Sequence, residues 1–210
     1  MLKTLNMMLK IMTLGTLLAF STQGSAELSP TQTVQESVDQ ILALLKDDAL
    51  DQEERRAKIR THINTRFDFK AMSQRTLATN WKKASEQERE KFIDLFSQLI
   101  ENTYIGKIEL YTDEKVEYPG EKVKGRKAVV ETLIIAASAD IPVDYRLYKK
   151  DDVWWVYDVI IEGVSLVSNY RSSYQEIVKK EGFEGLLAKM QEKIDELQSA
   201  PAPAEPVTAS

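Results

Sequence analysis

The chain contains no cysteine and only one histidine, His62, in 210 residues. The lack of cysteine excludes a disulfide framework, thiol catalysis and thiolate metal sites. Because His62 lies in a polar, charged stretch with no second histidine beside it, we expect it on the surface of a helix. Calcium-binding loops, nucleophile elbows and phosphate-binding glycine loops are also missing from the sequence. We therefore predict a protein that is not an enzyme and that holds no metal and no cofactor.

Long apolar runs are missing beyond the N-terminus. Lys3 and Lys10 are the only charges before Glu27, residues 11–20 form a short apolar core, and residues 24–26 are small. This pattern is typical of a cleaved secretory signal, and its core is too short to span a membrane. We expect residues 1–26 to be removed. Because there is no cysteine for lipid attachment, we expect the mature chain to be soluble in the periplasm, with no stable membrane insertion.

A basic surface is missing as well. Removal of Lys3 and Lys10 leaves 26 of the 28 basic residues against 33 acidic ones, a formal charge of −7 for residues 27–210. Binding to nucleic acid or to an anionic bilayer requires clustered lysine and arginine side chains. The charge therefore argues against both kinds of partner.

Apolar residues at helical spacing predict helices in the first half of the mature chain. Ser29, followed by a proline, marks the start of one helix, and Asp51 the start of a second. A short helix is expected after Asp68. The longest helix begins at Ser85 with capping-box spacing and continues to Tyr111.

From residue 115 to residue 161 the apolar residues recur with a period of two. This alternation predicts antiparallel strands with one packed face. In the last strand the predicted packed face is formed by Val153, Trp155, Tyr157, Val159 and Ile161.

Helical spacing then returns. One helix is expected over residues 166–180, with Gly182 as its C-cap, and another over residues 183–197. Helices, then a sheet, then helices indicate the α+β class. We expect one domain over residues 27–198 and a disordered, alanine- and proline-rich tail over residues 199–210.

Two acids, Asp158 and Glu162, interrupt an apolar run and raise the question of a catalytic pair. In a strand they lie about 13 Å apart at ~3.3 Å per residue. Paired-carboxylate hydrolysis uses roughly 5–9.5 Å. We therefore expect structural roles: Asp158 holding an arginine or accepting hydrogen bonds, and Glu162 closing the strand or capping the next helix.

The run from Trp154 to Leu166, continued by residues 169–171, resembles the signature of the MlaC family of periplasmic phospholipid carriers. Further matching positions are Phe67, Phe69, Met72, Leu77, Trp81, Phe92, Phe96, Thr103, Tyr104, Tyr111, Tyr145 and Arg146. The likeness covers roughly residues 30 to 195. One position departs from it, since Ala78 stands where the family has a glycine.

This resemblance implies an NTF2-like antiparallel sheet joined to a small helical subdomain. It implies that acyl chains of a glycerophospholipid are buried between sheet and helices as cargo. It also implies two protein partners: an outer-membrane lipoprotein–porin complex, and an inner-membrane ABC transporter complex with an MCE-domain protein. Shuttling between them would maintain outer-membrane lipid asymmetry. The alternatives are an NTF2-like small-molecule enzyme and a module that scaffolds an envelope complex.

The apolar residues available to line such a cavity lie on three predicted elements. They are Leu95, Leu99, Tyr104 and Ile108 on the long helix, Ile135, Ile141, Val143, Tyr145, Val159 and Ile161 on the sheet, and Val164, Leu166 and Val167 after it. Residues of these types at these positions are more often plain core than the wall of a ligand cavity. Ser165, Asn169 and Arg171 are candidates for the lipid head group. A second interpretation pairs Arg171 with Asp158 or Glu162 and makes Ser165 a helix cap.

Overall fold

The computed structural model describes residues 28–110, 115–136 and 139–199. The expected signal peptide and residues 200–210 of the expected tail lie outside these ranges. The helices are α1 (Pro30–Leu45), α2 (Gln52–Asn64), α3 (Phe69–Leu77), the 3-10 helix η1 (Ala78–Lys82), α4 (Glu86–Ile108) and α5 (Leu166–Ser199). The strands are β1 (Lys115–Lys124), β2 (Lys127–Ile135), β3 (Asp140–Lys150), β4 (Val153–Ile161) and β5 (Val164–Ser165). The α+β class predicted from the sequence is confirmed.

The helices begin where the sequence predicts, because the capping side chains satisfy free backbone N–H groups. Ser29 and Ser85 each form a complete capping box. Asp51 and Asp68 accept hydrogen bonds from the third residue of α2 and of α3. Within α5, Gly182 has φ 72° and breaks the helix into two arms. The chain therefore reverses at the predicted glycine.

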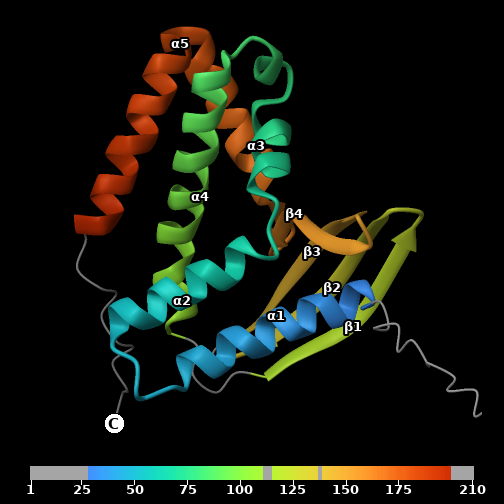
Figure 1. The fold of residues 1–210 in the computed structure, drawn as a ribbon. Helices are drawn as coiled ribbons and strands as arrows, with labels where there is room; N and C mark the ends of the chain where they lie inside the picture. Colours follow the sequence, from blue (N-terminus) through green and yellow to red (C-terminus); the bar gives the residue numbers. More distant parts are fainter. Residues whose placement is uncertain (1–27, 111–114, 137–138, 200–210) are drawn as a thin grey trace, which may run out of the picture.

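The five strands form one antiparallel sheet in the order β1-β2-β3-β4-β5. In Figure 1, α1 lies across the sheet, while α3, α4 and α5 stand together as a bundle at its side. The segment that enters α3 also joins the sheet, since Phe67 forms a parallel bridge with Val156 of β4. The bundle is thus connected to the sheet at β4.

A bulge in β4 changes which residues face the core. The register with β3 shifts between Arg146 and Leu147, so Tyr157 is an extra residue in the pairing. Trp154 and Val156 before the bulge, and Val159 after it, belong to one buried cluster. The prediction of a single uninterrupted alternation from Val153 to Ile161 was therefore wrong. A bulge inserts one residue and reverses the facing of every later side chain.

Within the described ranges, two hydrophobic clusters form the core. The bundle cluster joins α3, α4 and both arms of α5, with Phe92, Phe96, Leu186 and Ile194 almost completely buried. The sheet cluster joins α1 to β2, β3 and β4. Tyr104 of α4 packs against both clusters. The long helix α4 therefore belongs to the bundle at its start and to the sheet at its end.

The departure from the family pattern at Ala78 has a structural counterpart. Ala78 caps α3 with φ 50° and ψ −118°, a backbone conformation in which a Cβ is strained. Glycine adopts it without that strain.

Ala78→Gly is therefore expected to raise the free energy of unfolding by about 1 kcal/mol, since relief of strain exceeds the added flexibility of the unfolded chain. Urea unfolding monitored by circular dichroism measures the change. Ala71→Gly, in the first turn of α3, is the matched control and should destabilise by up to about 1 kcal/mol. Equal destabilisation by both substitutions would contradict the prediction.

Candidate functional site

A cavity of about 320 Å³ lies between the sheet and the helices; we call it the sheet cavity. Its sheet wall is formed by Ile134, Ile141, Val143, Tyr145, Val159 and Ile161. The facing wall is formed by Ile63, Phe67, Ile100, Tyr104, Ile105, Ile108 and Leu166. Three polar side chains, those of Glu101, Lys107 and Glu162, complete the lining. The space is thus apolar with few polar groups, as is typical of ligand sites.

Eight of the thirteen side chains predicted to contact lipid line this cavity. They are Tyr104, Ile108, Ile141, Val143, Tyr145, Val159, Ile161 and Leu166. Antiparallel pairing brings the sheet residues together, because Val143 stands opposite Ile161 and Tyr145 opposite Val159.

The other five lie elsewhere. Leu95, Leu99 and Val167 are buried in the bundle cluster. Val164 is 55% exposed beside the turn after β4. Ile135 follows Ile134 in β2, so its side chain projects from the opposite face of the sheet. The structure therefore places Ile134 in the position that the sequence analysis gave to Ile135.

A buried carboxylate is the main polar feature of the cavity. Glu101 is 9% exposed and accepts a hydrogen bond of 3.1 Å from Nδ2 of Asn64. Nε of Arg60 lies 3.8 Å from its second oxygen. Desolvation raises the pKa of Glu101, and these two contacts only partly oppose the rise. The sequence does not reveal this residue, because nothing in a helical stripe marks one acid among many as buried.

Glu101→Gln keeps the hydrogen bond with Asn64 and removes the desolvated charge. The pKa of Glu101 is raised in the folded protein, so the folded chain takes up a proton at a higher pH than the unfolded chain does. The charged carboxylate therefore lowers the free energy of unfolding at neutral pH. This cost disappears at acid pH, where the carboxyl group is protonated. We therefore expect the substitution to raise the free energy of unfolding by roughly 0.5–1 kcal/mol at neutral pH. This gain should shrink as the pH falls through the raised pKa toward the ordinary value of 4.5. Urea titrations across that range measure it, and a gain independent of pH would refute the assignment.

Lys107 and Glu162 are both exposed and mark the mouth of the cavity. Nζ of Lys107 lies 5.4 Å from the ring centroid of Tyr104. Glu162 and Gly163 both have positive φ and form the turn between β4 and β5. Glu162 therefore closes the strand, which is one of the two roles expected for it. Deeper in the cavity, burial raises the pKa of Tyr145 to about 12, so this phenol is neutral at physiological pH.

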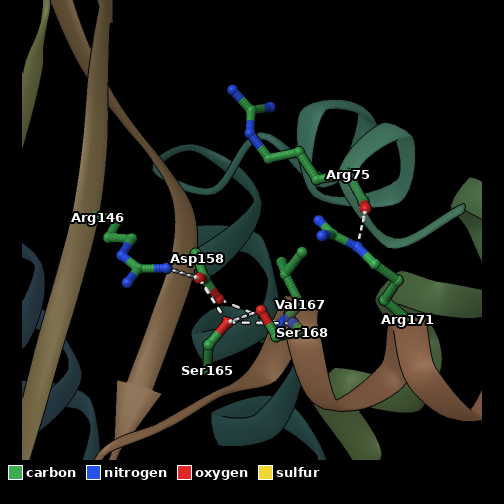
Figure 2. Close-up of polar contacts among 7 residues, drawn as sticks. All are labelled: Arg75, Arg146, Asp158, Ser165, Val167, Ser168 and Arg171. Atoms are coloured by element: carbon green, nitrogen blue, oxygen red, sulfur yellow. Dashed lines mark hydrogen bonds and ion pairs between the residues drawn. The ribbon is translucent and has the colours of Figure 1, made fainter. Parts of the chain in front are cut away.

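Asp158, the other acid of the pair that interrupts the apolar run, is the centre of a buried network at the start of α5 (Figure 2). Its side chain is 3% exposed and accepts a bond of 2.9 Å from Nη1 of Arg146. It also accepts from Oγ of Ser165 at 2.7 Å and from the backbone N–H of Val167 at 3.1 Å. Ser165 Oγ in turn accepts from the N–H of Ser168. Asp158 therefore joins β3, β4 and α5.

The three head-group candidates lie away from the sheet cavity. Ser165 caps α5 through Ser168, as the second interpretation held. Arg171 pairs with neither Asp158 nor Glu162; its Nε donates to the carbonyl oxygen of Arg75 at 2.8 Å, as Figure 2 shows. Asn169 is exposed and lines a different cavity, between α4 and α5.

Within the part of the chain that the structure describes, no cluster of three or more acidic or histidine side chains is arranged to hold a metal ion. In the same ranges, no helix combines the length and the hydrophobicity needed to cross a bilayer. The fold and the site together define an α+β protein with an apolar cavity of ligand size between its sheet and its helices.

Comparison with known proteins places this chain in a family. The model of the MlaC protein family matches residues 35–192, so the chain belongs to the MlaC family. A relative in Haemophilus influenzae, the intermembrane phospholipid transport system binding protein MlaC, is 26% identical over 177 residues, covering 80% of this chain and 83% of the relative. A solved phospholipid-binding protein from Ralstonia solanacearum, in complex with a phospholipid, is similar with a TM-score of 0.73. It is 25% identical, and the match covers 80% of this chain and 97% of that one.

Proposed function

We propose that this chain is a soluble periplasmic carrier that holds the acyl chains of a glycerophospholipid in the sheet cavity. The observation that carries the proposal is the apolar lining itself, in which side chains from β2, β3, β4 and α4 enclose one space. Membership of the MlaC family and the two phospholipid-related relatives support the same ligand class.

The energetics of the cargo require such a cavity. A diacyl lipid carries around thirty methylenes, each worth about 0.8 kcal/mol when it leaves water, so exposed tails would cost on the order of 24 kcal/mol. A carrier must shield nearly all of them. At about 320 Å³ the cavity lies at the low end of the ~300–1,000 Å³ of ordinary ligand sites. Loading of two complete chains therefore requires the sheet and α4 to move apart.

The head group belongs at the mouth of this cavity. Lys107 is exposed there and can place its ammonium group beside a lipid phosphate, while Glu162 lies at the same opening. A lysine interacts with phosphate as a point charge and therefore attracts it without selecting one head group. Transfer would occur by docking to the outer-membrane lipoprotein–porin complex and to the inner-membrane ABC transporter complex with its MCE-domain protein. The acidic mature chain suits docking to proteins better than adhesion to anionic bilayers.

The test is to express the protein in a Gram-negative periplasm, purify it without detergent, and extract it for mass spectrometry. We expect about one phospholipid per chain. Folded protein that carries no lipid and takes none from phospholipid vesicles would overturn the proposal.

One observation favours a second candidate, a small-molecule enzyme in the same cavity. Glu101 is a buried acid with a raised pKa, and buried acids of this kind occur in active sites. Its contacts with Asn64 and Arg60 fit a structural role equally well. Glu101→Gln separates the two functions, since a carrier should keep its lipid after this substitution.

A further inference from the structure

A second cavity, of about 310 Å³, lies between α4 and the two arms of α5; we call it the bundle cavity. It arises because Gly182 turns the chain back, so that the second arm of α5 descends beside α4 (Figure 1). Leu99, Leu186 and Met190 line it and are at most 4% exposed. The bundle cavity is therefore apolar inside, as an alkyl chain requires.

One of the side chains that line this cavity carries a buried hydroxyl without a hydrogen-bond partner. Tyr174 lines it, is 6% exposed, and packs edge-on against the rings of Phe92 and Phe96. Its hydroxyl oxygen is buried and has no hydrogen-bond partner. A buried polar group without a hydrogen-bond partner lowers the free energy of unfolding by about 1–3 kcal/mol. Burial also raises the pKa of Tyr174, so the hydroxyl stays protonated and remains a hydrogen-bond donor.

Two lysine side chains line the same cavity. The ring centroids of Tyr170 and Tyr174 are 5.5 Å apart. Burial raises the pKa of Tyr170, and the hydrogen bond with Thr103 and the charge of Lys193 partly oppose the rise. Lys189 and Lys193 both line the cavity, with 47% and 57% of their side chains exposed. Each contacts one exposed carboxylate, in surface pairs of a kind worth about 0–1 kcal/mol. An anionic ligand group could replace these weak partners.

The bundle cavity is separate from the sheet cavity. None of the described residues lines both. The two cavities use neighbouring positions of α4, with Leu99 and Thr103 facing the first, and Ile100 and Tyr104 facing the second. Each can therefore be closed by substitution without touching the other's lining.

We propose that the bundle cavity binds a single-chain anionic amphiphile of the fatty-acid type. Its alkyl chain lies on Leu99, Leu186 and Met190. Its carboxylate accepts a hydrogen bond from Tyr174 and is attracted by Lys189 and Lys193. The site does not depend on the proposed phospholipid function, because it uses a different set of residues.

Decanoate binding to the delipidated full mature chain, measured by isothermal titration calorimetry, tests the proposal. We expect the bundle cavity to bind one decanoate per chain. Decyltrimethylammonium, which has a similar alkyl chain but a positive charge, should bind about tenfold more weakly or worse, because Lys189 and Lys193 repel a cation. Met190→Trp fills the cavity and should weaken decanoate binding about tenfold or more. Because Met190 does not line the sheet cavity, Met190→Trp should still copurify with phospholipid. Decanoate binding therefore tests the bundle cavity, while copurified phospholipid tests the proposed carrier function.

Tyr174→Phe provides a readout that a purely structural tyrosine would not give. Removal of the unpartnered hydroxyl should raise the thermal stability of the ligand-free protein and weaken decanoate binding about threefold to tenfold. Ile161→Asp, in the sheet cavity, is the control and should leave this decanoate site unchanged. Decanoate binding that is lost with Ile161→Asp and unaffected by Met190→Trp and Tyr174→Phe would overturn the proposal. Equal affinity for the cationic amphiphile would also overturn it.

Discussion

Ile161→Asp should yield folded protein that carries almost no phospholipid. Ile161 lines the sheet cavity, so the new carboxylate would face the acyl chains. To become neutral at pH 7 from an ordinary pKa of ~3.9, it must take up a proton at a cost of about 4 kcal/mol. A charged form among the tails costs at least as much. We therefore expect the affinity for phospholipid to fall about 100-fold or more.

Ile160→Asp is the matched control for this experiment. Ile160 is the same residue type in the same strand, is also partly buried, and pairs with Asp144 and Ser165 instead of lining the cavity. For Ile160→Asp, the amount of phospholipid per chain should stay near the wild-type value when it is measured by mass spectrometry after detergent-free purification. If both variants retain lipid, the cargo does not lie in the sheet cavity.

Asp158→Ala should be the most destabilising single substitution in the region where the sheet meets α5. It removes a buried acceptor of three hydrogen bonds, leaves the N–H of Val167 without its partner, and reduces the hydroxyl of Ser165 to its contacts with Ser168. A hydrogen bond to a charged group contributes about 1.5–3 kcal/mol and a buried donor without a partner costs about 1–3 kcal/mol, so we expect a total loss of about 3–5 kcal/mol. For a chain of this size we expect Tm to fall by roughly 10 °C.

Arg146→Ala serves as the comparison. The Arg146 side chain is 40% exposed, so its pair with Asp158 is screened by solvent, and Asp158 keeps its other two bonds. The loss of stability should be clearly smaller, about 1 kcal/mol or a little more. Thermal unfolding by circular dichroism compares the two. Equal losses would mean that the Arg146 ion pair, not the bonds to Ser165 and Val167, carries the stability of the network.

The class and the order of elements follow from local signals, which is why they could be predicted. Ser29 and Ser85 cap their helices by accepting hydrogen bonds from nearby backbone N–H groups. Gly182 ends a helix because it adopts a positive φ. Neither effect depends on distant residues. The facing of strand residues is different. Alternation gives two faces but does not say which one is packed, and Ile134 and Ile135 are equally apolar. The bulge at Tyr157 depends on pairing with β3, and a single strand carries no signal for it.

Helix α4 is the main reason why the sequence predicts the lining of the sheet cavity only in part. Its apolar residues form one continuous pattern in the sequence, yet they serve two clusters and two cavities. Leu99 lies on the bundle side, whereas Tyr104, five residues further on, reaches the sheet cavity. Periodicity identifies apolar positions but carries no information about the neighbour that each one meets. For the same reason Arg146 could not be identified as the partner of Asp158, which depends on strand register.

The shared helix has a consequence for how the molecule unfolds. Because α4 supplies Phe92 and Phe96 to the bundle and Tyr104 to the sheet cluster, neither half can melt without removing a wall of the other. The bridge of Phe67 to β4 and the network around Asp158 add two further ties between the halves. We therefore expect the helical and sheet parts to unfold together, as one cooperative unit.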